Sequence, residues 1–158
     1  MQFFVAKRHF VCYNINEYYP EVLDMTRKEF EAMVLDLYNI RADYPFEEDF
    51  ETGVFRHQDS GKWFAIAMNI SYSKILSGRE GSVDVVNLKC APEVIESIAG
   101  IESGIFRAYH MNKTHWLTVA LDGSCDEDTI RWLVGISYDL TLKKILKRQK
   151  KQIKESKR

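Results

Sequence analysis

The segment 110–116, with the sequence HMNKTHW, concentrates the side chains of this protein that could do chemistry. It supplies imidazole, amide and ammonium groups, which can donate hydrogen bonds to a phosphate, a carboxylate or a base edge. Two further polar residues alternate on one face of a predicted strand, and a serine lies on a predicted helix. We therefore expect a polar cluster, or ligand pocket, at one end of a sheet. Its members are Asn87, Lys89, His110, Asn112, Lys113, His115 and Ser137.

The same groups are a poor set for catalysis or for metal binding. His110 and His115 are five residues apart, and no acid or cysteine lies close in sequence to complete a metal site. A nucleophile–base pair from Cys90, Ser137 and His110 would need a convergence that no spacing requires. The chain has no P-loop, GxGxxG or nucleophile-elbow motif. The sequence therefore predicts a protein that is not an enzyme and holds neither metal nor cofactor.

Charge divides the chain into an acidic body and a basic tail. Residues 143–158 hold nine basic residues and one acid, a net charge of +8, whereas residues 1–142 hold 13 basic and 22 acidic residues, a net charge of −9. Such a tail predicts contact with DNA phosphates, and a solvated extension is the alternative. A predicted hairpin and the 110–116 loop add three cations. The predicted DNA contacts are Arg56, Lys62, Lys113, Lys143, Lys144, Lys147, Arg148, Lys150 and Lys151.

Short-range signals predict the elements that position these residues. Thr26 and Glu29 have the spacing of a capping box, and apolar residues then recur at helical spacing over about 26–39. Turn residues at 58–61 separate two strands of a hairpin. Further strands are expected over 83–89 and 115–121, a short helix over 92–99, and a last helix from about residue 126 into the tail.

This order of elements predicts an α+β fold, with an antiparallel sheet covered on one face by helices. The length fits one domain, which we place at 25–142. Residues 1–24 form an N-terminal extension in which two short strands are expected, and residues 143–158 form a basic, helical C-terminal tail.

Three segments together resemble the MmcQ/YjbR family. Its members share an NLK-x-x-PE segment, here 87–93, a YHMNK-x-HW segment, here 109–116, and a closing SY pair, here Ser137-Tyr138. The resemblance covers about 25–142 and implies a fold similar to that of frataxin, or CyaY. It also implies DNA binding through β-hairpin wings. An acidic body departs from that expectation unless its charge is very unevenly distributed.

Three functions stay open at this point. The first is DNA binding of weak or no sequence specificity through the tail and a hairpin. The second is a protein- or small-anion-binding module that uses the polar cluster. The third is frataxin-like metal handling, which rests on the fold resemblance alone.

Cysteine usage and hydropathy predict a cytoplasmic protein. Cys12, Cys90 and Cys125 are far apart and form no CxxC pair, which favours a reducing compartment. No apolar run approaches the roughly 18 residues of a membrane helix, and the first residues lack the order of a secretory signal. We therefore expect no membrane partner.

Overall fold

The structure is a computed structural model that describes residues 25–156, without the side chains of 143–151 and 153. The two short strands predicted within 1–24 lie outside the described residues. Among the described residues, the first helix begins where the sequence predicts. Thr26 caps α1 (Arg27–Tyr38), and the Glu29 carboxylate accepts from the Thr26 N–H at 2.7 Å, which completes the capping box. The helix ends at Asn39, whose left-handed backbone (φ 54°) stops further helical pairing.

Five strands form one antiparallel sheet, in the order β1-β2-β3-β5-β4. The strands are β1 (Gly53–Arg56), β2 (Trp63–Ser71), β3 (Ser82–Lys89), β4 (Ile105–Arg107) and β5 (Trp116–Ala120). The predicted hairpin and the antiparallel sheet are confirmed. The sequence analysis missed β4 and a short 3-10 helix, η2 (Tyr72–Lys74), because three residues are too few to show a periodicity.

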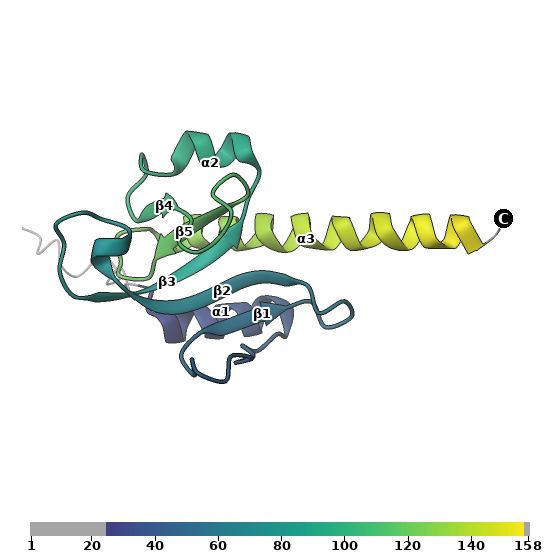
Figure 1. The fold of residues 1–158 in the computed structure, drawn as a ribbon, viewed down its shortest axis with the longest axis horizontal. Coiled ribbons are helices and arrows are strands. Elements are labelled where there is room, and N and C mark those ends of the chain that lie inside the picture. Colours follow the sequence, from purple (N-terminus) through teal and green to yellow (C-terminus); the bar gives the residue numbers. More distant parts are fainter. Residues whose placement is uncertain (1–24, 157–158) are drawn as a thin grey trace, which may run out of the picture.

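The helices bury one face of the sheet in a single core, as Figure 1 shows. The first, α1, packs through Phe30 and Val34, and α2 (Pro92–Ile98) packs through Ile95. The last, α3 (Glu127–Ser156), packs through Ile130 and Leu133 along its first half and then continues beyond the sheet. On the other face, Tyr72 and Val85 form a smaller apolar cluster. Its other members are Ile70, Val83 and Ala120.

The antiparallel pairing sorts the loops between two ends of the sheet. At one end, which we call the Lys89 end, β1 and β3 finish while β2 and β5 begin. This end therefore carries the hairpin turn 57–62 and the loop 108–115. The opposite, or Asp84, end carries the loops 72–81 and 121–126. Since α3 starts after the 121–126 loop and contacts the backbone of Lys89 through Ser137, it runs from the Asp84 end to the Lys89 end.

Among the described residues, no helix is long and apolar enough to cross a membrane. The cytoplasmic location stays a prediction, and so does the likeness to frataxin.

Candidate functional site

A buried polar network on two neighbouring strands fixes the start of the loop 108–115. Asn87 and Thr118 are fully buried on neighbouring strands. The Thr118 hydroxyl donates to the Asn87 carboxamide oxygen at 2.5 Å and accepts from the Tyr109 N–H at 2.9 Å. Asn87 in turn donates to the Tyr109 carbonyl at 2.8 Å. These bonds use the polar groups of Asn87 structurally, and they fix the backbone just before His110.

Asn112 shapes the exposed part of the same loop. Its side-chain oxygen accepts from the Thr114 N–H at 2.8 Å, and its carbonyl accepts from the N–H groups of His115 and Trp116. His110 adopts a left-handed conformation (φ 55°), which turns the chain at this point. The loop therefore presents an exposed surface on a backbone with many internal bonds. Its exposed polar residues are His110, Asn112, Lys113, Thr114 and His115.

Ser137 does not join this network, because it acts on the opposite face of the sheet. The ladder between β2 and β3 stops at Ala65 and Leu88. At the next position the Ser137 hydroxyl of α3 accepts from the Lys89 N–H at 2.7 Å and donates to the Phe64 carbonyl. It thus replaces a ladder bond where the two strands separate. The predicted single polar cluster is divided in two by the sheet.

Lys89 and Trp116 lie across the last pair of β3 and β5. The Lys89 ammonium is 5.0 Å from the centre of the Trp116 ring, a cation–π distance. Trp116 itself is 8% exposed and so belongs mainly to the packing of the sheet end.

Residues at the end of β1 attach the β1–β2 hairpin, which is the predicted wing, to the rest of the domain. Arg56 pairs with Asp43 at 2.7 Å and lies over the Trp63 ring at 5.5 Å, so its charge is already balanced. His57 is 2% exposed, with its Nε2 atom 2.7 Å from the Thr141 hydroxyl of α3. Burial lowers the pKa of His57, and nearby Asp59 offsets part of that effect. His57 therefore joins the hairpin to α3 and presents little surface for a ligand.

The predicted DNA contacts of the tail lie on α3 just beyond the contact between His57 and Thr141. Thr141 lies one turn before residue 144, and the backbone of α3 stays helical to Ser156, well beyond the sheet (Figure 1). The tail therefore leaves the domain at the Lys89 end. The side chains of Lys143, Lys144, Lys147, Arg148, Lys150 and Lys151 lie outside the described residues.

Charge differs between the two ends of the sheet. The loop 108–115 has one lysine, two histidines and no acid, and the tail leaves the domain at the same end of the sheet. By contrast, the segment 121–128 at the Asp84 end has four acids and no base. The loop 43–51, which runs along β1 from Arg56 toward Asp84, has five acids and no base. The acidic body is thus unevenly charged along the strands.

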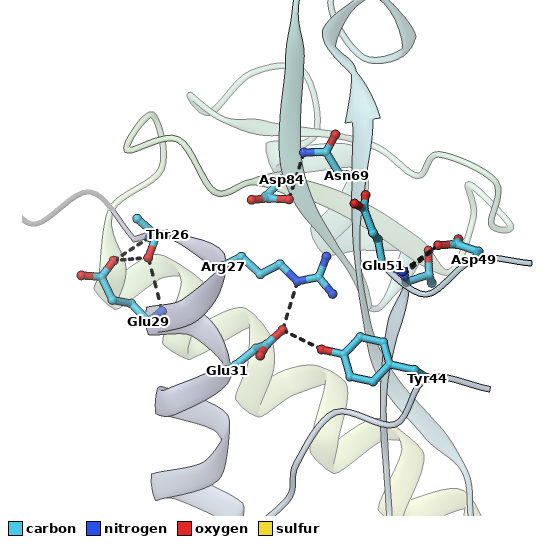
Figure 2. A network of polar contacts seen from close by, with 10 residues as sticks. Thr26, Arg27, Glu29, Glu31, Tyr44, Asp49, Glu51, Asn69 and Asp84 are labelled. Atoms are coloured by element: carbon cyan, nitrogen blue, oxygen red, sulfur yellow. Dashed lines mark hydrogen bonds and ion pairs between the residues drawn. The ribbon is translucent and has the colours of Figure 1, made fainter. Parts of the chain in front are cut away.

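An open hollow of about 500 Å³ lies at the Asp84 end, where the sequence analysis predicted no site. Figure 2 shows its polar groups: the Arg27 guanidinium reaches out from α1 toward the strands, and Asn69 donates to Asp84 at 3.1 Å. Its lining residues are Arg27, Tyr44, Phe50, Glu51, Asn69 and Asp84. They come from four separate segments, so no local motif could have indicated it. No three His, Cys, Asp or Glu side chains converge as a metal site in the part of the chain that the structure describes.

Known proteins resemble most of this chain. A family model described as YjbR matches residues 35–140. Uncharacterized protein YyaQ of Bacillus subtilis is 32% identical over 74% of this chain and 98% of its own length. A crystal structure of a Pseudomonas syringae protein has a TM-score of 0.71 and 39% identity, covering 74% of this chain and 99% of that one. A DUF419 protein of Deinococcus radiodurans follows, with a TM-score of 0.56 and 26% identity over 74% of this chain and 78% of that one.

Proposed function

Since the chain belongs to the YjbR family, we propose that it is a non-enzymatic DNA-binding protein that contacts phosphates with its basic tail and the Lys89 end of its sheet. The observation that carries the proposal is the course of α3. This helix leaves the domain beside the hairpin turn, at the end of the sheet that also carries the loop 108–115, so the +8 segment extends from the less acidic end of the body.

The length of the tail suits contact with a phosphate backbone. Residues 143–156 continue α3 for 14 residues, which at 1.5 Å per residue is about 21 Å. Double-stranded DNA carries one charge per about 1.7 Å of axis, so several phosphates fall within that span. Lys113, on the exposed loop, adds a cation at the same end of the sheet. Contacts of this kind position a protein on DNA but do not read sequence, so we expect weak sequence preference.

Fluorescence anisotropy with a labelled duplex tests the proposal. The full chain and residues 1–142 are titrated at about 50 mM and about 200 mM salt. Because each phosphate contact releases counterions, we expect the affinity of the full chain to fall by about 10³-fold or more between these salts if six or more phosphates are contacted. The chain that ends at Leu142 should bind far more weakly at both salts.

A tail variant with Lys144, Lys147 and Lys151 changed to Gln serves as the control for truncation, because it keeps the helix length. We expect it to reduce both the affinity and the salt slope. Binding by the full chain that does not depend on salt, or equal binding by 1–142, would contradict the proposal.

A second candidate is recognition of a small anion or a protein by the loop 108–115. The observation in its favour is that Lys113, His110 and His115 are exposed on a backbone fixed by Asn87 and Asn112. Thermal shifts with phosphate and carboxylates separate the two functions. A shift for 1–142 that Lys113→Ala removes would favour this candidate, since the tail takes no part in it.

A further inference from the structure

The loop 43–51 exposes aromatic rings among carboxylates. Its sequence, DYPFEEDFE, has five acids, three aromatic residues and no base. Phe50 is 79% exposed and Tyr44 is 46% exposed. Aromatic side chains are frequent anchors of protein interfaces, and the acids give this surface a strong negative charge. We call it the acidic-aromatic loop.

The loop borders the hollow at the Asp84 end. Tyr44, Phe50 and Glu51 line that hollow together with Asp84. Its one cation, Arg27, already donates to Glu31 at 3.0 Å, so its charge is balanced locally (Figure 2). A complementary occupant therefore carries positive charge, together with apolar groups to cover Phe50.

The tail of α3 has both properties. Positions 142, 146, 149 and 153 are spaced by four and three residues, so they share one helix face, and three of the four are Leu or Ile. Six lysines fall together on another face. They stand at Lys143, Lys144, Lys147, Lys150, Lys151 and Lys154.

The tail cannot reach this loop within its own molecule. The helix is continuous from Glu127 to Ser156, and its first half is fixed to the sheet by Ser137 and Thr141. It leaves at the Lys89 end and points away from the body (Figure 1), whereas the hollow lies at the Asp84 end. A continuous helix cannot reverse its direction, so an occupying tail must come from another molecule.

We propose that the tail helix of one molecule docks on the acidic-aromatic loop and hollow of a second copy of this chain. Charge complementarity supports this partner, because a +8 tail meets a −9 body. The apolar face of the tail covers Phe50 and Tyr44, and its lysines face Glu47, Glu48 and Glu51. An anionic lipid surface, which would also attract the tail, would repel the body.

Analytical ultracentrifugation of nuclease-treated full chain at about 50 mM and about 500 mM salt measures the association. We expect dimers or larger assemblies at low salt and monomers at high salt. The variant Glu47→Lys/Glu48→Lys should associate at least about tenfold more weakly, because it places like charges opposite the tail. Asp36→Lys/Glu102→Lys, which changes the net charge equally at exposed positions elsewhere, should associate as the native chain does.

A complementation test guards against loss of folding in the variant. A second variant, Lys144→Glu/Lys147→Glu/Lys151→Glu, lowers the net charge of the tail from +8 to +2 and should associate far more weakly alone. An equal mixture of the two variants should associate again, because the native tail of the first variant can dock on the native loop of the second. A monomeric native chain at low salt, native association by Glu47→Lys/Glu48→Lys, or a monomeric mixture would overturn the proposal.

This association is independent of DNA binding, and the two tests fail separately. A chain that binds duplex but stays monomeric without it refutes only the docking. A chain that associates but does not bind duplex refutes only the proposed function. If both hold, added duplex should dissociate the assemblies, since both partners use the tail.

Discussion

His57 illustrates how one residue acquires a role that its type does not suggest. A histidine beside a hairpin turn predicts a surface contact, yet here the ring packs against Phe64 and Tyr138, with centroids 5.4 Å and 4.4 Å away. The Thr141 hydroxyl donates to the carbonyls of its own helix, which leaves it able to accept from His57 Nε2. A neutral imidazole protonated on Nε2 satisfies this arrangement.

We expect His57 to make stability depend on pH. Burial lowers the pKa of folded His57 below its ordinary value of 6.5. The unfolded chain therefore binds a proton first, so the stability from this site is fully present above about pH 6.5 and is lost as pH falls through the folded pKa. Urea unfolding at about pH 7.5 and about pH 5.5 measures the loss.

The variant His57→Gln should lose less stability over the same pH interval, although its free energy of unfolding at the higher pH is lower. His110→Gln, at an exposed position, is the matched control and should behave as the native chain does. Equal losses in native chain and His57→Gln would assign the pH dependence to other groups.

At the scale of elements, α3 is joined to the sheet by hydrogen bonds as well as by apolar contacts. Ile130, Leu133 and Val134 bury its apolar face. Ser137, one turn further, completes the β2–β3 ladder where the backbone groups of Phe64 and Lys89 would otherwise lose their partners. A serine in the middle of a helix usually lowers helix propensity, so its place here follows from the sheet.

We expect Ser137→Ala to lower the free energy of unfolding by about 2 kcal/mol or more, because a buried N–H and a buried carbonyl both lose a partner. Chemical denaturation measures this loss of free energy, and the dependence of the free energy on denaturant concentration should stay unchanged. Ser97→Ala removes a hydroxyl that bonds a carbonyl on the exposed side of α2 and should cost under about 1 kcal/mol. A loss for Ser137→Ala no larger than that for Ser97→Ala would show that α3 docks through apolar contacts alone.

At the scale of the whole molecule, the strand directions separate the charges. The acidic segment 121–128 lies at the Asp84 end, and the acidic loop 43–51 runs along β1 from Arg56 toward that end. The tail extends from the Lys89 end, which also carries the loop 108–115. Such a separation lets one end approach phosphates while the opposite end attracts cations. The net charge of the whole chain, −1, gives no sign of this charge separation.

Single lysines at the two ends give a matched test. Lys113→Gln should weaken duplex binding at all sequences and reduce the salt slope by about 1, because one phosphate contact is lost. Lys74→Gln removes the same charge at the Asp84 end and should leave binding nearly unchanged. Anisotropy titrations over several salt concentrations measure both. Equal effects of the two substitutions would mean that only net charge matters.

The sequence by itself determined most of the elements of this protein. The capping box at Thr26 and Glu29, the hairpin around 58–61 and the family segments at 87–93 and 109–116 are local patterns, and local backbone preferences act within a few residues. These patterns predicted α1, β1, β2, β3 and the antiparallel sheet. The charge split at residue 143 is likewise fixed by the sequence.

Only the tertiary structure decided which of these residues meet. Asn87 and Ser137 lie on opposite faces of the sheet, although both belong to family segments, because strand alternation points Asn87 away from the face that α3 covers. It buries His57 against a helix residue 84 positions later. It also builds the hollow from Arg27, Phe50, Asn69 and Asp84, which share no local spacing. Contacts between distant segments depend on strand register and helix packing, which short-range patterns do not encode.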